Sequence, residues 1–159
     1  MVIDFFDFIE YIKQERYRSC IIHYEKPSIL SKYMKKVSNL YSHEIHYFNI
    51  INYFKENNSI TTELDLFNNL KFFELLTNIS KGKKVLLIDG LDLLFDTWDN
   101  NTKQMFFNTL KTGWDSFKDN YTTILIFCLI TTEDLKSLRI DDSRGNNKIK
   151  HLSLFKDIS

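Results

Sequence analysis

The segment 83–95, KKVLLIDGLDLLF, constrains the fold more than any other part of the chain. Residues 85–88 form a short uninterrupted apolar run, and Asp89 and Gly90 follow it at once. An apolar run of this length that ends in a turn is typical of a strand buried on both faces of a parallel sheet. Such a strand would deliver the Asp89 carboxylate to the carboxyl edge of the sheet, where open α/β sheets bind ligands.

Strands and helices are expected to alternate along the rest of the chain. Apolar runs bounded by polar turns predict strands at residues 19–24, 44–51, 85–88, 124–130 and 149–155. Because parallel neighbours need helical crossovers, this alternation predicts an α/β fold, a three-layer parallel sheet with helices on both faces. The most continuous apolar runs are 19–24, 85–88 and 124–130, so we expect strand 85–88 to lie centrally between the other two.

Apolar side chains at helical spacing predict the helices. An amphipathic helix within residues 1–18 opens the chain, with Asp4 as its N-cap. Further helices are expected at 29–37 after Pro27, at 66–79 behind a capping box of Thr62 and Asp65, at 106–117, and at 133–138 after Thr132. The apolar residues 93–95 form either a buried helical turn or an exposed surface for a partner.

Length and charge limit the functional classes. A chain of 159 residues is long enough for one independent core, so a single domain over residues 1–159 is expected. The 21 basic and 21 acidic side chains cancel, which excludes the global positive charge that drives strong non-specific nucleic-acid binding. Contact with DNA would therefore depend on a local basic patch.

Cysteine and histidine spacing gives no metal site or disulfide framework. Cys20 and Cys128 are far apart and lie in apolar runs, which predicts buried, unreactive thiols. His43 and His46 are three residues apart near a strand and need not share a face, so a metal site there is not favoured. No secretory leader and no apolar run of the roughly 20 residues that span a bilayer is visible, so we expect an intracellular, cytoplasmic protein without a membrane partner.

The segment 85–89 resembles the Walker B strand of P-loop NTPases, in which several apolar residues precede an Asp that holds Mg²⁺ through water. The resemblance implies a P-loop NTPase-like domain of the RecA or AAA+ type and gives Asp89 the metal-binding role. In those branches the strand beside Walker B ends in a polar sensor residue, and Thr131 or Thr132 stands in the matching place. The alternative for Thr132 is an ordinary helix N-cap.

The loop after strand 19–24 departs from the P-loop pattern. A Walker A loop, G-x-x-x-x-G-K-[ST], belongs here because glycines let backbone amides wrap the phosphates. The sequence HYEKPSIL supplies Lys26 and Ser28 but no glycine, and Pro27 removes a backbone donor. Two alternatives stay open: a residual ATP and Mg²⁺ site made by Lys26, Ser28, Asp89 and Thr131, or a P-loop-like fold that has lost its phosphate cradle.

The resemblance extends to two groups of proteins that act through partners and DNA. The small P-loop protein of BREX phage-defence systems carries a comparable strand followed by Leu-Phe, and Walker-less RecA-like paralogues, such as subunits of the yeast Shu complex, keep such a strand without the glycine loop. This implies a non-hydrolysing pseudo-ATPase, a structural or regulatory subunit of a DNA-handling assembly in phage defence or recombination, with no catalytic residue. The alternative is an enzyme that binds Mg-ATP weakly.

Aromatic and basic residues suggest how such an assembly would form. Adjacent rings on one helix point about 100° apart, so some are expected beyond the core-facing stripe and available for self-association or a protein partner. The rings in question are Phe5, Phe6, Phe8, Phe72, Phe95, Phe106, Phe107 and Trp114. A local DNA-facing patch would draw on Lys13, Arg16, Arg18, Lys35, Lys36, Lys81, Lys83 and Lys84.

Overall fold

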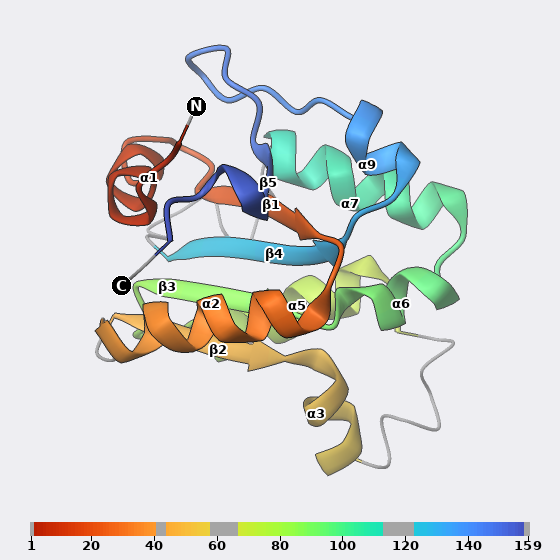
Figure 1. Cartoon of the computed structure of the whole chain (residues 1–159). Coiled ribbons are helices and arrows are strands. Elements are labelled where there is room, and N and C mark those ends of the chain that lie inside the picture. Colours follow the sequence, from red (N-terminus) through yellow and green to blue (C-terminus); the bar gives the residue numbers. More distant parts are fainter. Residues whose placement is uncertain (1, 41–43, 58–66, 113–122, 158–159) are drawn as a thin grey trace.

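The computed structural model describes residues 2–40, 44–57, 67–112 and 123–157, and a five-stranded sheet lies at its centre (Figure 1). The strands lie in the order β2-β3-β4-β1-β5, and every neighbouring pair is parallel. Their bounds are β1 Ser19–Tyr24, β2 Ile45–Asn49, β3 Val85–Asp89, β4 Ile124–Ile130 and β5 Ile149–His151. The predicted α/β class and parallel sheet are confirmed.

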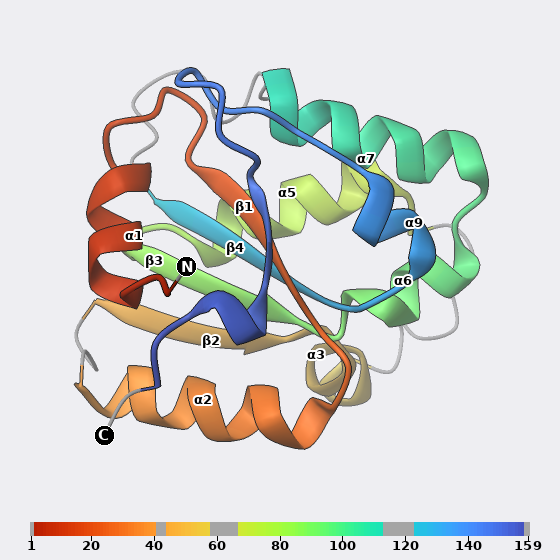
Figure 2. The same ribbon diagram turned by 45° about the horizontal axis from the view of Figure 1, so that its top comes forward.

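Helices connect the strands and cover both faces of the sheet. Their bounds are α1 Phe5–Ile12, α2 Pro27–Leu40, α3 Ile50–Glu56, α5 Asn69–Ile79, α6 Leu91–Thr97, α7 Asn100–Thr112, α9 Glu133–Ser137 and the 3₁₀ helix η2 Leu152–Leu154. Helices α1 and α2 pack on one face, and α3, α5, α6 and α7 pack on the other (Figure 2). The chain crosses the sheet one way from β1 to β2 and returns from β2 through β3 to β4, so right-handed crossovers place the two sets on opposite faces.

Both faces of the sheet are buried, and successive side chains alternate between two cores. In β1, Ile21 faces the core under α5 and α7, whereas Cys20 and Ile22 face the core under α1 and α2. Burial on both faces explains why β3 and β4 are uninterrupted apolar runs. The expected burial of both thiols is confirmed, and burial raises the pKa of Cys20 to about 12.

The predicted place of β3 in the sheet is wrong. β3 does not lie between β1 and β4: β4 separates β1 from β3, and β3 lies between β4 and β2. β2 pairs with β3 in continuous register, from Ile45 opposite Val85 to Asn49 opposite Asp89. An apolar run reports burial on both faces, a property that β3 and β4 share, while the order across the sheet depends on the crossovers.

Two strands end earlier than predicted because a helix begins at each end. β2 ends at Asn49, whose side chain accepts a hydrogen bond from the Asn52 N–H at 3.1 Å and caps α3. Residues 50–51 therefore belong to a helix that the alternation of strands and helices did not predict. β5 ends at His151, which caps η2 in the same way.

Several helix predictions are confirmed within the described ranges. Asp4 caps α1, and its carboxylate accepts hydrogen bonds from the backbone N–H groups of Phe6 and Asp7. Helix α5 begins after Asn68, whereas the capping box predicted at Thr62 and Asp65 lies outside the described residues. The helix predicted over 106–117 corresponds to α7, which begins earlier, at Asn100, and is described as far as Thr112.

Most of the aromatic rings singled out by the sequence pack inside the molecule, and among the described residues none of them is fully exposed. Phe5, Phe8, Phe72 and Phe106 are buried, and Phe6, Phe95 and Phe107 are half-buried against the two cores, while Trp114 lies outside the described residues. Helices α5, α6 and α7 share one face of the sheet, so a ring that leaves the core stripe meets the next helix. Phe106, for example, stacks on Phe73 at 5.9 Å and meets Phe127 edge-on at 5.1 Å.

The apolar residues 93–95 are a buried turn rather than a partner patch. Leu94 is fully buried in α6, and Leu93 and Phe95 are half-buried against the same core. The exposed large apolar side chains of the described residues are instead mostly aliphatic: Val2, Ile29, Leu40, Tyr47, Ile51, Leu70, Met105 and Ile130.

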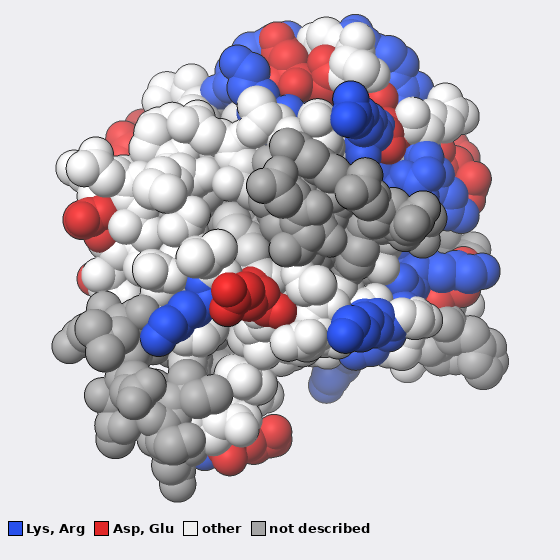
Figure 3. All heavy atoms as spheres, turned by 180° about the vertical axis from the view of Figure 1, so that it is seen from behind, with Lys and Arg blue, Asp and Glu red and all other residues white. Residues whose placement is uncertain are grey.

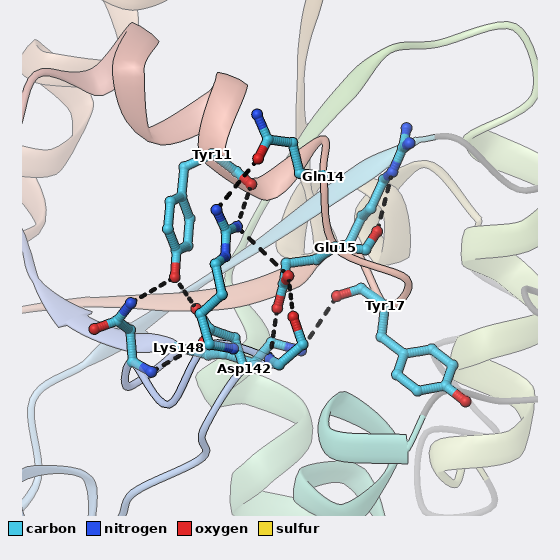
Figure 4. Close-up of polar contacts among 10 residues, drawn as sticks. Tyr11, Gln14, Glu15, Tyr17, Asp142 and Lys148 are labelled. Atoms are coloured by element: carbon cyan, nitrogen blue, oxygen red, sulfur yellow. Dashed lines mark hydrogen bonds and ion pairs between the residues drawn. The ribbon is translucent and has the colours of Figure 1, made fainter.

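A polar network closes the amino edge of the sheet, between the end of α1 and the loop before β5 (Figure 4). Glu15 is buried and accepts hydrogen bonds from the Ser143 N–H at 2.7 Å and the Ser143 hydroxyl at 2.5 Å. The guanidinium of Arg144 lies 3.4 Å from the Glu15 carboxylate and stacks over the Tyr11 ring, 3.3 Å from its centroid. The Tyr11 hydroxyl in turn donates to Asp142 at 2.5 Å.

A buried lysine completes the amino edge. Lys148 Nζ donates to the Leu110 carbonyl at 2.5 Å, to the Ser19 hydroxyl at 3.2 Å and to the Tyr17 carbonyl at 3.3 Å. Burial lowers the pKa of Lys148. All three protons of the ammonium group therefore have acceptors, as a buried charge requires.

Candidate functional site

Asp89 stands at the carboxyl end of β3, at the edge predicted for a site. Gly90 follows it with φ of 80° and lets α6 begin directly after the strand. A Cβ atom at Gly90 would lie 3.2 Å from Ile51 Cγ1 and 3.3 Å from the Ile51 backbone nitrogen. Both the positive φ and the close approach of α3 therefore favour glycine here.

Two tyrosine hydroxyls, one from β1 and one from β2, bind the Asp89 carboxylate. Tyr24 Oη donates to Oδ1 at 3.1 Å, and Tyr47 Oη donates to Oδ2 at 2.6 Å. The Gly90 N–H adds a third hydrogen bond to Oδ1 at 2.8 Å. Both carboxylate oxygens are therefore engaged by groups of the chain itself.

The strand order decides which residues can make these contacts. Tyr24 ends β1, and β4 lies between β1 and β3, so the two backbones are about 9.6 Å apart. A long side chain is needed to cross β4, and the tyrosine ring provides it. Tyr47 lies on β2, directly beside β3, and the Asn49 side chain approaches its hydroxyl at 3.4 Å.

The tyrosines act as hydrogen-bond donors at neutral pH. Burial, followed by the nearby Asp89 carboxylate, raises the pKa of Tyr24 well above its usual value. Burial and the hydrogen bond to Asp89 raise the pKa of Tyr47 in the same direction. Both phenols stay protonated, so the pair neutralises none of the Asp89 charge but satisfies its acceptor oxygens.

A second carboxylate at this edge has a structural contact. Asp92, on the first turn of α6, accepts a hydrogen bond from the Ile130 N–H at 3.2 Å and so joins α6 to the end of β4. Burial raises the pKa of Asp92. Asp89 and Asp92 thus both already serve as hydrogen-bond acceptors within the fold.

Lys26 and Ser28 do not join Asp89. Both are exposed at the start of α2, where Pro27 occupies the first helical position and the Lys26 carbonyl accepts from the Ile29 N–H at 3.1 Å. Among the described residues, no hydrogen bond or ion pair connects either side chain to the Asp89 carboxylate. Lys26, Ser28 and Asp89 therefore lie at the predicted edge of the sheet, but their side chains do not form one hydrogen-bonded group.

The two candidate sensor threonines have different roles. The Thr132 hydroxyl accepts from the Leu135 N–H at 3.2 Å, which makes Thr132 the N-cap of α9, the alternative predicted for it. The Thr131 hydroxyl lies 2.8 Å from His23 Nδ1, on the other side of β4 from Asp89. Burial lowers the pKa of His23, so this ring is held mainly neutral.

Sequence reasoning missed the tyrosines. The apolar patterns place Tyr24 at the end of one strand and Tyr47 within another, and neither pattern indicates a contact with Asp89. Their positions at or near the carboxyl ends of β1 and β2 were a usable indication, because parallel strands bring their carboxyl ends to one edge. The reach of Tyr24 over β4 could not be inferred without the strand order.

Neither a cluster of metal ligands among the described residues nor a match to a known protein points to a function for this edge. In the described ranges, no three His, Cys, Asp or Glu side chains come together as metal ligands, and His43 lies outside those ranges. Among the described helices, none combines the length and apolar content that crossing a bilayer requires. Comparison of the sequence with models of protein families and with characterised proteins gave no match.

Proposed function

We propose that this chain is a non-hydrolysing, P-loop-like subunit that serves as a structural or regulatory component of a larger assembly. The observation that carries the proposal is the engagement of both Asp89 oxygens by Tyr24 and Tyr47. A Walker B carboxylate works by holding the water shell of Mg²⁺, which needs accessible oxygens. Here two phenols occupy that position.

The loop after β1 supports the same proposal. Residues 25–28 contain no glycine, and Pro27 has no N–H to offer a phosphate oxygen. Phosphoryl transfer depends on neutralising and positioning the β and γ phosphates. A carboxylate covered by tyrosines beside a loop without a phosphate cradle supplies neither requirement.

A second candidate, a weak Mg-ATP-binding enzyme, is favoured by one observation. Lys26 and Ser28 are both exposed at the start of α2, where a phosphate group could reach them. Metal binding at Asp89 would first require the Tyr24 and Tyr47 hydroxyls to move away. This cost makes nucleotide binding the weaker candidate.

A DNA-handling assembly follows from the family resemblance and has some support in the charge distribution. Arg16 and Arg18 precede β1, and Lys81, Lys83 and Lys84 precede β3, so parallel strands bring both groups to the amino edge. Figure 3 shows Lys and Arg side chains toward one side of the molecule, mixed with some acidic ones. DNA contact is therefore proposed as local and secondary to protein contacts.

Nucleotide titration tests the central proposal. Purified protein with Mg²⁺ and a fluorescent ATP analogue should show no saturable binding at micromolar concentration and no ATP turnover. The variant Asp89→Asn should match the wild type. The double variant Tyr24→Phe with Tyr47→Phe removes both hydroxyls from the carboxylate and serves as the comparison in which Mg²⁺ and nucleotide would bind most easily. Turnover in the wild type that disappears in Asp89→Asn would contradict the proposal and favour the second candidate.

Fluorescence anisotropy with duplex DNA at two salt concentrations tests the amino edge. Replacement of Lys81 and Lys84 by Gln should weaken binding and reduce its salt dependence. Replacement of Lys103 and Lys136, which lie on α7 and α9, is the matched control. Each pair contains one lysine in an exposed ion pair, Lys84 with Glu44 and Lys136 with Glu133. Equal effects of the two double variants would exclude a local DNA site at this edge.

A further inference from the structure

We propose that the groove between α2 and the C-terminal segment around η2 binds an organic anion with an apolar, ring-containing body. This α2 groove has a volume of about 530 Å³, within the usual range for small-molecule sites. Ile29, Lys32, Tyr33 and Lys36 of α2 form one wall, and Leu152 and Phe155 form the opposite wall. The inference requires neither Asp89 nor a phosphate loop, although Tyr24 and Lys26 also line the groove.

The wall on α2 is one continuous helical stripe. Residues 29, 32, 33 and 36 lie on the same side of a helix, and the stripe extends for two turns, about 10 Å. The groove therefore begins at the first turn of α2, where Lys26 and Ile29 line it, and runs along the helix to Lys36. An elongated ligand fits this shape better than a phosphate group bound at the helix end.

A hydrogen bond and an ion pair between the two sides mark the ends of the groove. Glu25 accepts a hydrogen bond from His151 Nε2 at 2.7 Å near the end of β1. Lys36 Nζ lies 3.3 Å from Asp157 two turns further along α2. Both pairs connect segments more than a hundred residues apart in the sequence, and they hold the walls in position.

Lys32 gives the middle of the groove an uncompensated positive charge. It lies between the two ends and makes no ion pair or hydrogen bond among the described residues. The neighbouring apolar side chains Ile29 and Phe155 lower the local polarity and strengthen its attraction for an anion. This charge next to apolar walls predicts a ligand that is both anionic and apolar.

A buried hydroxyl provides a second, independent indication of a ligand. Tyr33 is only 8% exposed, and its Oη atom has no hydrogen-bond partner among the described residues. Burial raises the pKa of Tyr33, and the carboxylates of Asp4 and Asp157 add to the effect, so the phenol keeps its proton. Buried polar groups in folded proteins are almost always satisfied. An acceptor on a ligand in the groove would satisfy this donor once the side chains that cover it move apart.

A titration of the full chain with 8-anilinonaphthalene-1-sulfonate tests the site, because this probe combines aromatic rings with one sulfonate. We expect saturable one-to-one binding to the wild type. Lys32→Met should weaken it at least about fivefold, the effect of losing one charge-assisted contact. Lys35→Met is the matched control, since Lys35 is exposed on the same helix outside the groove. Absence of saturable binding, or equal affinities of the two variants, would overturn the proposal.

Two further measurements identify the site and the ligand class. Backbone amide spectra should show shifts in α2 and in residues 151–157 when the probe binds, and shifts confined to other elements would refute the location. Inorganic pyrophosphate, an anion without an apolar body, should bind at least about tenfold more weakly than the probe. Equal affinity for pyrophosphate would refute the requirement for an apolar body. Tyr33→Phe should retain the fold and lower the affinity for the probe. Unchanged affinity would show that the Tyr33 hydroxyl does not bind the ligand.

Discussion

The two edges of the sheet use similar polar residues in opposite ways. At the amino edge, Glu15 and Lys148 are buried, and each meets several partners from segments far apart in the sequence. At the carboxyl edge, Lys26 and Ser28 are exposed, and Asp89 is half-buried beneath two tyrosines. Charges that the fold satisfies completely hold the structure together. Those left partly open are where a ligand or partner can compete.

A buried hydroxyl sharpens the contrast. The Lys148 ammonium has three acceptors, whereas the Tyr33 hydroxyl has none. Both side chains are at least nine-tenths buried. An unsatisfied buried donor costs about 1–3 kcal/mol, so it persists only where another requirement maintains it. The proposed ligand of the α2 groove is such a requirement.

Removing Glu15 should have the largest effect on stability. Glu15→Ala leaves the Ser143 N–H and the Arg144 guanidinium without their buried acceptor, and we expect a loss of about 2–3 kcal/mol in the free energy of unfolding. Urea unfolding followed by circular dichroism measures it. Glu10→Ala is the control, because the exposed Glu10 and Lys13 pair should contribute well under about 1 kcal/mol. Similar losses in both variants would show that the amino edge is not a stabilising network.

Removing one hydroxyl from the carboxyl edge should have a moderate effect. Tyr24→Phe deletes a single hydrogen bond to Asp89 and should cost about 1 kcal/mol of unfolding free energy. In an Asp89→Asn background the cost should fall, because the hydrogen bond to a carboxylate is the stronger one. A double-mutant cycle from urea unfolding gives the coupling energy. Zero coupling would mean that the contact contributes nothing to stability.

The same change at Tyr33 should act in the opposite direction. Tyr33→Phe removes a hydroxyl that has no partner and should leave stability unchanged or raise it by up to about 1 kcal/mol. Thermal unfolding of the unliganded protein, beside Tyr24→Phe, makes the comparison direct. A clear destabilisation would show that the hydroxyl is satisfied in solution and would weaken the case for a ligand.

The smallest expected effect is a pH dependence from His23. Burial lowers its pKa below the usual 6.5, with His151 and Lys136 acting in the same direction and Glu25 against it. The unfolded chain therefore binds more protons, so stability should rise with pH between the lowered pKa and about 6.5 and level off above it. Unfolding free energies of wild type and His23→Asn between pH 5 and 8 isolate this contribution. A wild-type slope no steeper than that of the variant would contradict the assignment.

Predictions based on short-range chemistry were the successful ones. The Asp4 and Thr132 N-caps depend on hydrogen bonds to backbone groups two or three residues away, and both are present. The bounds predicted for β1 and β4 are confirmed as well, because burial on both faces leaves an uninterrupted apolar run. The α/β class followed from the alternation of these elements.

The sequence by itself determined most of the elements, though not α3, as well as the parallel sheet and the delivery of Asp89 to its carboxyl edge. The tertiary structure alone decided that β4 separates β1 from β3, so that Tyr24 reaches Asp89 across it. It also decided that most of the aromatic rings pack into the two cores, and that the Tyr33 hydroxyl is buried in the core under α1 and α2 with no hydrogen-bond partner among the described residues. Helix caps and apolar runs are encoded within a few residues. Contacts between residues 65 or 135 positions apart depend on the order of the crossovers, which no local pattern records.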